Sequence, residues 1–336
     1  MKKTAGRSRS GQKVQGARKL ALPRVTEDGI PLTPVDGKSV IGNLKIKAIE
    51  PPPFPSTRER LIVKTPSRKK ETTSEPSDTR ESTTRRKPER QEGSSLKKKG
   101  SAAKSRVIFG NDNRNLHTPT NVFPNRAVCR LLVTYPLTPT GSRWLGTGYL
   151  IGPRHVLTAG HVLFKADEGG WSQTIRVIPG CDGNTWWFGS ELLTWPNFRQ
   201  RSVEGWSEDQ DIDYDYGLIT LNTGFPTLGS FGLLYMNSDT LESSNGSIIG
   251  YPAERGTPRG TQQFGMTGGI TDCDSTLVYY GIDTTGGQSG AGVYRFWEGK
   301  RAIFAVHGGG YDSDENRGAR ITKARYDKIR GWQNAD

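Results

Sequence analysis

A single serine lies in a glycine-dense turn between two strand-like runs, in the stretch Asp283-Thr284-Thr285-Gly286-Gly287-Gln288-Ser289-Gly290-Ala291-Gly292-Val293-Tyr294. A hydroxyl is a weak nucleophile at neutral pH, so Ser289 can act as one only beside a base that a carboxylate orients. Glycine adopts backbone angles closed to other residues, so Gly286 and Gly287 let the N–H groups of Gly287 and Ser289 point into one cavity as an oxyanion hole. The turn therefore predicts a histidine and an aspartate elsewhere in the chain, each at the end of a strand.

Both partners lie upstream of the turn. His161 follows the strand-like run HVLTAG, which stops at small residues, so its imidazole is predicted to face a cleft as the general base. Three acids precede the apolar run at 216–221, and Asp215 is predicted to hold the imidazole tautomer because it adjoins that run. Asp211 and Asp213 compete for this role and are otherwise expected to be solvated.

The three residues occur in an order that separates unrelated enzyme classes. His161, Asp215, Ser289 is the order of chymotrypsin-like enzymes, whereas subtilisins run Asp, His, Ser and α/β-hydrolases run Ser, Asp, His. With TAGH, DYG and GGQSG in this order, the chain resembles the chymotrypsin-like serine peptidases. Within them it resembles the glutamyl endopeptidases of the V8-like type, through YDYG at 214–217, DTTGGQSG at 283–290, AVHGGG at 305–310 and NRGARITK at 316–323. The match runs from about Val107 to the C-terminus.

This resemblance implies a fold, an activity and a pocket. The fold would be all-β, with two six-stranded antiparallel β-barrels, the base and its carboxylate on the first and the nucleophile on the second. The activity would be that of a serine endopeptidase that cleaves after Glu, and less so after Asp, through an acyl-enzyme. Thr284, His307 and the freed α-amine of Val107 would meet the acid of the substrate. Two alternatives remain: a serine peptidase of the same clan with non-acidic specificity, and a non-catalytic homologue used for binding.

Short β-branched and aromatic runs alternate with Gly, Pro, Asn and Asp from Ala127 onward, which is typical of an all-β fold. The predicted strands lie at 133–135, 148–151, 154–157, 175–178, 186–193, 216–221, 246–251, 262–266, 277–282, 292–296 and 301–307. One helix is predicted over 322–332, where apolar and aromatic side chains recur near helical spacing. The spacing alone also permits a sandwich or a single large barrel, so the two-barrel architecture depends on the resemblance.

Composition divides the chain near Arg106. Residues 1–106 contain one aromatic residue, Phe54, and carry 27 Lys and Arg against 11 Asp and Glu, a net charge of +16. The whole chain carries +13, so residues 107–336 carry −3, and they hold all the other aromatic residues. Residues 1–106 are therefore predicted to be a basic, mostly disordered prosegment, and residues 107–336 a chymotrypsin-like peptidase domain.

The basic segment has a rival interpretation. Its clusters at 85–87 and 97–99 are able to neutralise phosphates, but no aromatic residues interleave with them for base stacking, so no nucleic-acid partner is expected. A prosegment instead implies a zymogen, which would mature by cleavage of the Arg106–Val107 bond ahead of VIFG. The freed amine would not pair with an acid beside the serine, as in trypsin-like zymogens, because that neighbour is Gln288.

A prosegment also implies export, so the protein is predicted to be secreted, although no signal peptide is legible. The apolar run behind the basic start, Leu20 to Leu22, is far shorter than the roughly 7 residues that a signal requires. No transmembrane span is predicted. The expected partners are protein or peptide substrates, with no membrane partner, and the protein is expected to be a monomer.

The three cysteines, Cys129, Cys181 and Cys273, permit at most one internal disulfide. Related bacterial glutamyl enzymes often carry a cysteine directly after the catalytic histidine, but this chain has Val162 there, so that disulfide is missing. No pair of Cys or His has the spacing of metal ligands, and neither a metal nor another cofactor is expected.

Overall fold

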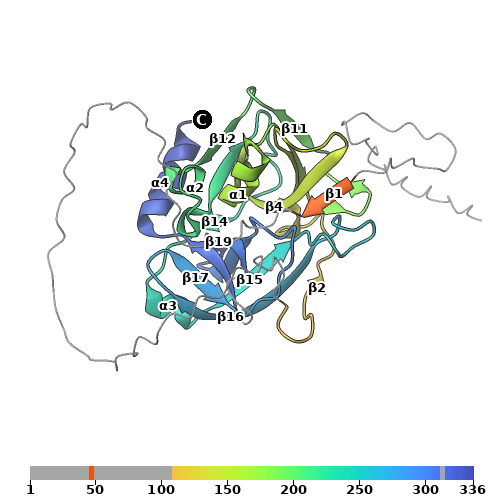
Figure 1. Cartoon of the computed structure of the whole chain (residues 1–336). Coiled ribbons are helices and arrows are strands. Elements are labelled where there is room, and N and C mark those ends of the chain that lie inside the picture. The colour runs from red at the N-terminus through yellow and green to blue at the C-terminus, as the bar shows by residue number, and fades with distance from the viewer. Residues whose placement is uncertain (1–44, 49–107, 311–314) are drawn as a thin grey trace, which may run out of the picture. The chain divides into compact units, whose positions relative to one another are not determined.

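The computed structural model describes residues 45–48, 108–310 and 315–336, with side chains described for the last two ranges. Predictions about the rest of residues 1–106, and about Val107, lie outside the described residues. The described chain is mostly β, with two large sheets and a C-terminal helix (Figure 1). The predicted all-β class with one C-terminal helix is therefore confirmed.

The first sheet is an open, half-closed barrel. Its antiparallel strands follow the order β11 (Glu191–Thr194), β8 (Thr174–Pro179), β3 (Val128–Thr134), β4 (Ser142–Gly152), β5 (His155–Thr158), β13 (Gly217–Thr220) and β12 (Arg199–Ser202). β1 (Lys45–Ala48) pairs in parallel with the first residues of β4. Among the described strands no ladder joins β11 to β12, so the first barrel differs from the closed six-stranded one that was expected.

The second sheet closes on itself. Its strands follow the order β14 (Gly232–Leu233), β19 (Lys300–Gly310), β18 (Gly292–Trp297), β15 (Asn245–Gly250), β16 (Phe264–Cys273), β17 (Leu277–Tyr280) and β20 (Asn316–Arg320). A further ladder joins β20 back to β19, so the six strands from β19 to β20 form a closed barrel, and β14 and β2 (Asn115–Leu116) add to it. The expected second barrel is present.

Strand boundaries depart from the sequence prediction where polar or glycine residues intervene. The expected strand at 186–193 is divided between β10 (Thr185–Trp186) and β11, with Gly189 in the left-handed region at φ +70° between them. β12 and β20 carry the sequences RQRS and NRGAR, whose charges conceal them from a hydrophobicity pattern. They form strands because neighbouring strands supply their backbone partners, β13 for β12 and β17 for β20.

Tyr149 of β4 joins the two sheets. Its side chain is fully buried, and its hydroxyl donates to the Ile249 carbonyl of β15 at 2.7 Å and accepts from the Ile249 N–H at 2.9 Å. Its ring packs on Phe231, with centroids 4.6 Å apart, and Phe231 packs on Tyr294 of β18. Because a buried hydroxyl must be hydrogen-bonded, this contact fixes how β4 meets the second barrel.

Short elements complete the described chain. They are η1 (Asn125–Ala127), α1 (Gly160–Leu163), β6 (Phe164–Lys165), η2 (Ala166–Glu168), β7 (Gly170–Trp171), β9 (Cys181–Asp182), α2 (Glu204–Ser207), η3 (Ile212–Tyr214) and α3 (Ser238–Glu242). In the described ranges, no helix is long and apolar enough to cross a membrane. The three cysteines are free thiols, and burial raises the pKa of Cys181 to about 11.

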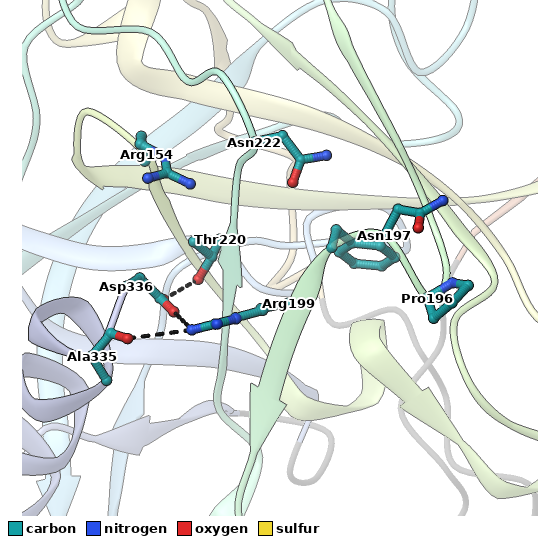
Figure 2. Close-up of a pocket in the computed structure, with 9 residues that line it drawn as sticks. Arg154, Pro196, Asn197, Arg199, Thr220, Asn222, Ala335 and Asp336 are labelled. Atoms are coloured by element: carbon teal, nitrogen blue, oxygen red, sulfur yellow. Dashed lines mark hydrogen bonds and ion pairs between the residues drawn. The ribbon is translucent and has the colours of Figure 1, made fainter.

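The C-terminal helix α4 (Lys323–Asn334) starts where Thr322 accepts a hydrogen bond from the Arg325 N–H, an N-cap that agrees with the predicted start. At its other end the buried Asp336 carboxylate accepts from Arg199, Arg201 and Thr220 of the first sheet. The cavity at this junction has a volume of about 460 Å³. Figure 2 shows that Asp336 points toward Arg199 and Thr220 in it. None of the predicted site residues lines this cavity, so it belongs to the docking of the helix.

Candidate active site

His161 and Asp215 come from two neighbouring strands of the first sheet. β5 ends at Thr158, and His161 is the second residue of the short helix α1 that follows. Asp215 is the C-cap that follows η3, two residues before β13 begins. β5 and β13 are antiparallel partners in which Thr158 faces Gly217, so the two side chains meet although they lie 54 residues apart.

Asp215 contacts both the backbone and the ring of His161. Its Oδ1 accepts from the His161 N–H at 2.9 Å, and its Oδ2 lies 2.7 Å from Nδ1. Because a carboxylate only accepts, Nδ1 carries the proton and Nε2 is the basic nitrogen. His161 is 0% and Asp215 is 4% exposed. Among the described residues, Nε2 of His161 has no hydrogen-bond partner.

The two rival acids have other positions. Asp211 is exposed and caps η3, where its Oδ1 accepts from the Asp213 N–H at 3.0 Å. Asp213 is itself inside η3 and half-buried. The geometry therefore brings Asp215, and neither of the others, to His161.

Two aromatic residues contact His161, one at its ring and one at its backbone. The Trp206 ring meets the His161 ring edge-on, with centroids 6.0 Å apart, and its Nε1 donates to the Phe164 carbonyl at 3.1 Å. The Tyr135 hydroxyl donates to the carbonyls of His161 and Val162 at 3.2 and 2.9 Å. Sequence reasoning missed both residues because they lie far from His161 in the chain.

The turn that contains Ser289 is bound to the same strands. The Ser289 carbonyl accepts from the Thr147 N–H of β4 at 2.9 Å, and the Gly287 carbonyl accepts from the Thr147 hydroxyl at 2.8 Å. The Thr158 hydroxyl, at the end of β5, donates to the Thr147 carbonyl at 2.8 Å. Three hydrogen bonds thus connect the serine turn to the strand that leads into His161.

Two glycines of the turn are required by space and by backbone angle. Gly287 has φ +95°, and a Cβ there would lie 2.4 Å from the Tyr251 carbonyl oxygen. Gly290 has φ +84°, and a Cβ there would lie 2.1 Å from the Thr158 hydroxyl. Within residues 108–310 and 315–336 the Gly287 N–H donates no hydrogen bond. The turn therefore presents a backbone donor beside the serine, as an oxyanion site requires.

His307 lies next to this turn on β19. The Gly290 N–H donates to its carbonyl at 2.9 Å, and its own N–H donates to the Ala291 carbonyl at 2.8 Å. Its ring is buried, with Nδ1 2.7 Å from the hydroxyl of Tyr280 on β17. Burial lowers the pKa of His307 to about 3, and the nearby positive charge of Arg317 acts in the same direction. His307 is therefore neutral at pH 7 in the substrate-free protein.

Thr284 and the beginning of the described domain meet at Asp283. Thr284 is 2% exposed and follows Asp283, whose carboxylate oxygens accept from the N–H groups of Phe109 and Asn113 at 2.8 and 2.9 Å. Val107, the predicted third element of the pocket, lies outside the described residues. The chain therefore enters the domain beside the predicted pocket.

Sequence reasoning missed three residues that the tertiary structure adds to this region: Tyr280, Asp283 and Arg114. Asp283 stood in a quoted motif but had no assigned role. Tyr280 and Arg114 lie in a strand and a loop with no catalytic pattern, and only a contact map identifies them. No group of three or more His, Cys, Asp or Glu side chains in the described ranges could hold a metal ion.

No family model matches the chain. It is 36% identical over 231 residues to a Bacillus subtilis (strain 168) protein named extracellular metalloprotease, covering 68% of this chain and 70% of the relative. It is 33% identical over 236 residues to the glutamyl endopeptidase of Bacillus licheniformis, covering 68% and 69%. A solved Glu endopeptidase in complex with MPD superposes with a TM-score of 0.58 at 28% identity, over 68% of this chain and 100% of that one.

The chain therefore belongs to the chymotrypsin-like serine peptidases related to glutamyl endopeptidase. It is a serine endopeptidase, and the fold and family that the sequence motifs indicated are confirmed. Human heparin binding protein shares the fold alone, with a TM-score of 0.50 at 15% identity.

Proposed function

We propose that the protein is a secreted zymogen that cleaves peptide bonds after glutamate, and less so after aspartate, with His161, Asp215 and Ser289 as its catalytic triad. The observation that carries this proposal is the buried His161–Asp215 pair, whose 2.7 Å contact leaves Nε2 as the basic nitrogen. The bonds from Thr147 to the serine turn support Ser289 as its partner.

The reaction follows from these positions. Nε2 of His161 removes the proton of the Ser289 hydroxyl as Oγ attacks the carbonyl carbon, and Asp215 stabilises the imidazolium that forms. The N–H groups of Gly287 and Ser289 donate to the oxyanion of the tetrahedral intermediate. The imidazolium then protonates the departing amine, an acyl-enzyme remains, and a water activated by His161 releases the acid.

Preference for glutamate rests on His307, Thr284 and the α-amine of Val107. A buried carboxylate costs several kcal/mol unless donors and positive charge meet it. The pKa of Tyr280 is raised well above its ordinary value by burial, so its hydroxyl keeps its proton and can donate to Nδ1 of His307 in the tautomer protonated at Nε2. That tautomer leaves Nε2–H of His307 as a donor. A substrate carboxylate in contact with it raises the pKa of His307, so the ligand itself favours the cation that binds it.

Maturation at the Arg106–Val107 bond is supported by the contacts of Asp283. The Phe109 and Asn113 N–H groups bind its carboxylate, so the residues that follow the proposed cleavage site are held beside Thr284. An amine freed two residues earlier would then be near the substrate pocket, whereas the uncut chain would lack that charge. Secretion is supported by the name of the Bacillus subtilis relative, which describes an extracellular protein.

One set of measurements tests the proposal. An active-site serine phosphonate should label Ser289, and N-terminal sequencing of the active enzyme should begin at Val107. A peptide library should then show cleavage after Glu well above cleavage after Gln, and His307→Ala should reduce that ratio far more than it reduces basal turnover. Equal cleavage after Glu and Gln would refute charge recognition, and cleavage after Lys, Arg or large apolar residues would favour the alternative of non-acidic specificity. An unlabelled protein would favour the non-catalytic alternative.

The monomeric state remains a prediction from the sequence, and size-exclusion chromatography with light scattering of the active protein checks it.

A further inference from the structure

A buried arginine contacts both sides of the serine turn. The Arg114 side chain is 1% exposed, and its Nη1 donates to the Thr285 hydroxyl at 2.7 Å and to Gln288 Oε1 at 2.6 Å. Its Nη2 donates to Asp112 Oδ2 at 2.7 Å and to Glu254 Oε1 at 2.6 Å. One planar guanidinium thus joins three separate parts of the chain at once.

Gln288 is the residue directly before Ser289, and its carbonyl oxygen has two donors. Besides Arg114, the Thr285 N–H donates to Gln288 Oε1 at 3.0 Å. The Thr285 hydroxyl in turn donates to Glu254, whose carboxylate oxygens lie 2.7 and 2.6 Å away. Thr285 and Gln288, which flank Gly286 and Gly287, therefore both accept from one nitrogen, Nη1 of Arg114, and the direction of the Gly287 N–H depends on both residues.

The charge balance favours a positioning role over a stabilising one. Asp112 and Glu254 neutralise Arg114, but ion pairs that exclude water contribute little net stability, because desolvation offsets their attraction. What a bidentate guanidinium does supply is a fixed geometry. Gln288 has no charge with which to bind a freed amine, and it accepts instead from the buried cation Arg114.

We propose that Arg114 is a positioning residue that orients the Gly287 N–H toward the oxyanion by holding Gln288 and Thr285. This inference rests on the proposed function of Ser289 and Gly287. Loss of a whole oxyanion donor lowers kcat about 10²- to 10³-fold, so a donor that is misdirected but present should lower it by about tenfold to a hundredfold. The effect belongs to kcat and leaves KM nearly unchanged, because the oxyanion exists only after attack.

The test compares Arg114→Met and Gln288→Met, separately and together, on any peptide that the wild-type enzyme cleaves. Each variant is made as the full chain, and its N-terminus is sequenced after maturation. Both single variants should lower kcat with KM within about twofold, and should slow labelling by the serine phosphonate in parallel. The double variant should be no slower than the slower single variant, because both remove one contact.

Arg255→Met is the matched control. Arg255 binds the same Asp112 at 2.7 Å and the Arg114 carbonyl at 3.1 Å but, among the described residues, forms no hydrogen bond or ion pair with residues 283–290. It should lower the melting temperature less than Arg114→Met does, because Arg255 is 31% exposed and has fewer partners, and it should leave kcat unchanged. Arg114→Lys, which keeps the charge but not the fork, provides a second variant if Arg114→Met does not fold, and its kcat should lie between those of wild type and Gln288→Met.

Three results would overturn the inference: an unchanged kcat in the Arg114 and Gln288 variants, an equal fall in Arg255→Met, or single effects that multiply in the double variant. A wild-type protein that is not labelled at Ser289 contradicts the proposed function, and the inference with it. A labelled wild-type protein whose Arg114 variants behave like Arg255→Met contradicts the inference alone.

Discussion

The two sheets hold their halves of the site in different ways. The open first sheet presents His161 and Asp215 at strand ends, where their side chains contact each other directly. Trp206 packs on the His161 ring, and Tyr135 donates to the His161 carbonyl. The closed second barrel presents Ser289 in a turn that depends on a buried polar network around Arg114. The base can therefore be oriented by one carboxylate, whereas the nucleophile turn requires several distant chain segments to be in place.

The largest effect should come from the chemistry of each half. Ser289→Ala and His161→Ala should each lower kcat by about 10⁵- to 10⁶-fold, and Asp215→Asn by about 10⁴-fold, because the wrong imidazole tautomer is left in place. Steady-state hydrolysis by the matured enzyme measures this. Asp213→Asn, a neighbouring acid without contact to His161, is the control and should remain active. If Asp213→Asn inactivates and Asp215→Asn does not, the assignment of the carboxylate is wrong.

The next effect concerns the contact between the halves. Gly290→Ala should destabilise the protein by about 3 kcal/mol or more, because its Cβ would meet the Thr158 hydroxyl at 2.1 Å in a left-handed backbone. Gly281→Ala is the control, since a Cβ there has nothing within 4 Å. Urea unfolding of both variants decides it. Equal stability would mean that the serine turn is not held against the end of β5.

A smaller effect follows from the buried imidazole of the second barrel. The folded pKa of His307 is about 3, below the roughly 6.5 of an unfolded histidine, so only the unfolded state takes up this proton between those values. The contribution of His307 to the free energy of unfolding is complete above pH 6.5. It should fall by about 1.4 kcal/mol for each pH unit as the pH drops toward 3. Urea unfolding at several pH values should show a shallower slope for His307→Gln. His117 and His155 titrate in both proteins, so identical slopes would contradict the assignment.

The smallest effect belongs to the first sheet, away from the chemistry. Asp336→Asn should cost about 1–3 kcal/mol, because Arg199, Arg201 and Thr220 lose a charged acceptor at the end of α4. Thermal unfolding measures the loss, and kcat should not change. Lys323→Met, which removes an exposed ion pair on the same helix, is the comparison and should be nearly neutral. A fall in kcat for Asp336→Asn would show that the contact between Asp336 and the first sheet influences the geometry of the proposed active site.

Sequence patterns correctly predicted the β class, the helix at 322–332 and the family, because turn glycines and strand-forming residues act locally. They missed β12 and β20, whose charged residues give no apolar alternation. They also joined two strands wrongly into one at 186–193, since Gly189 between β10 and β11 was treated as part of a run. Prediction failed where a segment becomes a strand because a neighbouring strand supplies its hydrogen-bond partners. That is a property of the sheet and not of the segment.

The candidates His161, Asp215 and Ser289 could be proposed from the sequence because catalysis restricts which residue types can serve and in which local setting. The contact between His161 and Asp215 could not be, since they lie 54 residues apart and touch only after β5 and β13 pair. The same holds for Tyr280 beside His307 and Arg114 beside Gln288, which are separated by 27 and 174 residues. Neighbouring residues in the sequence determine which chemical groups a motif contains. Burial, charge balance and hydrogen-bond geometry arise only when distant segments pack together and exclude water.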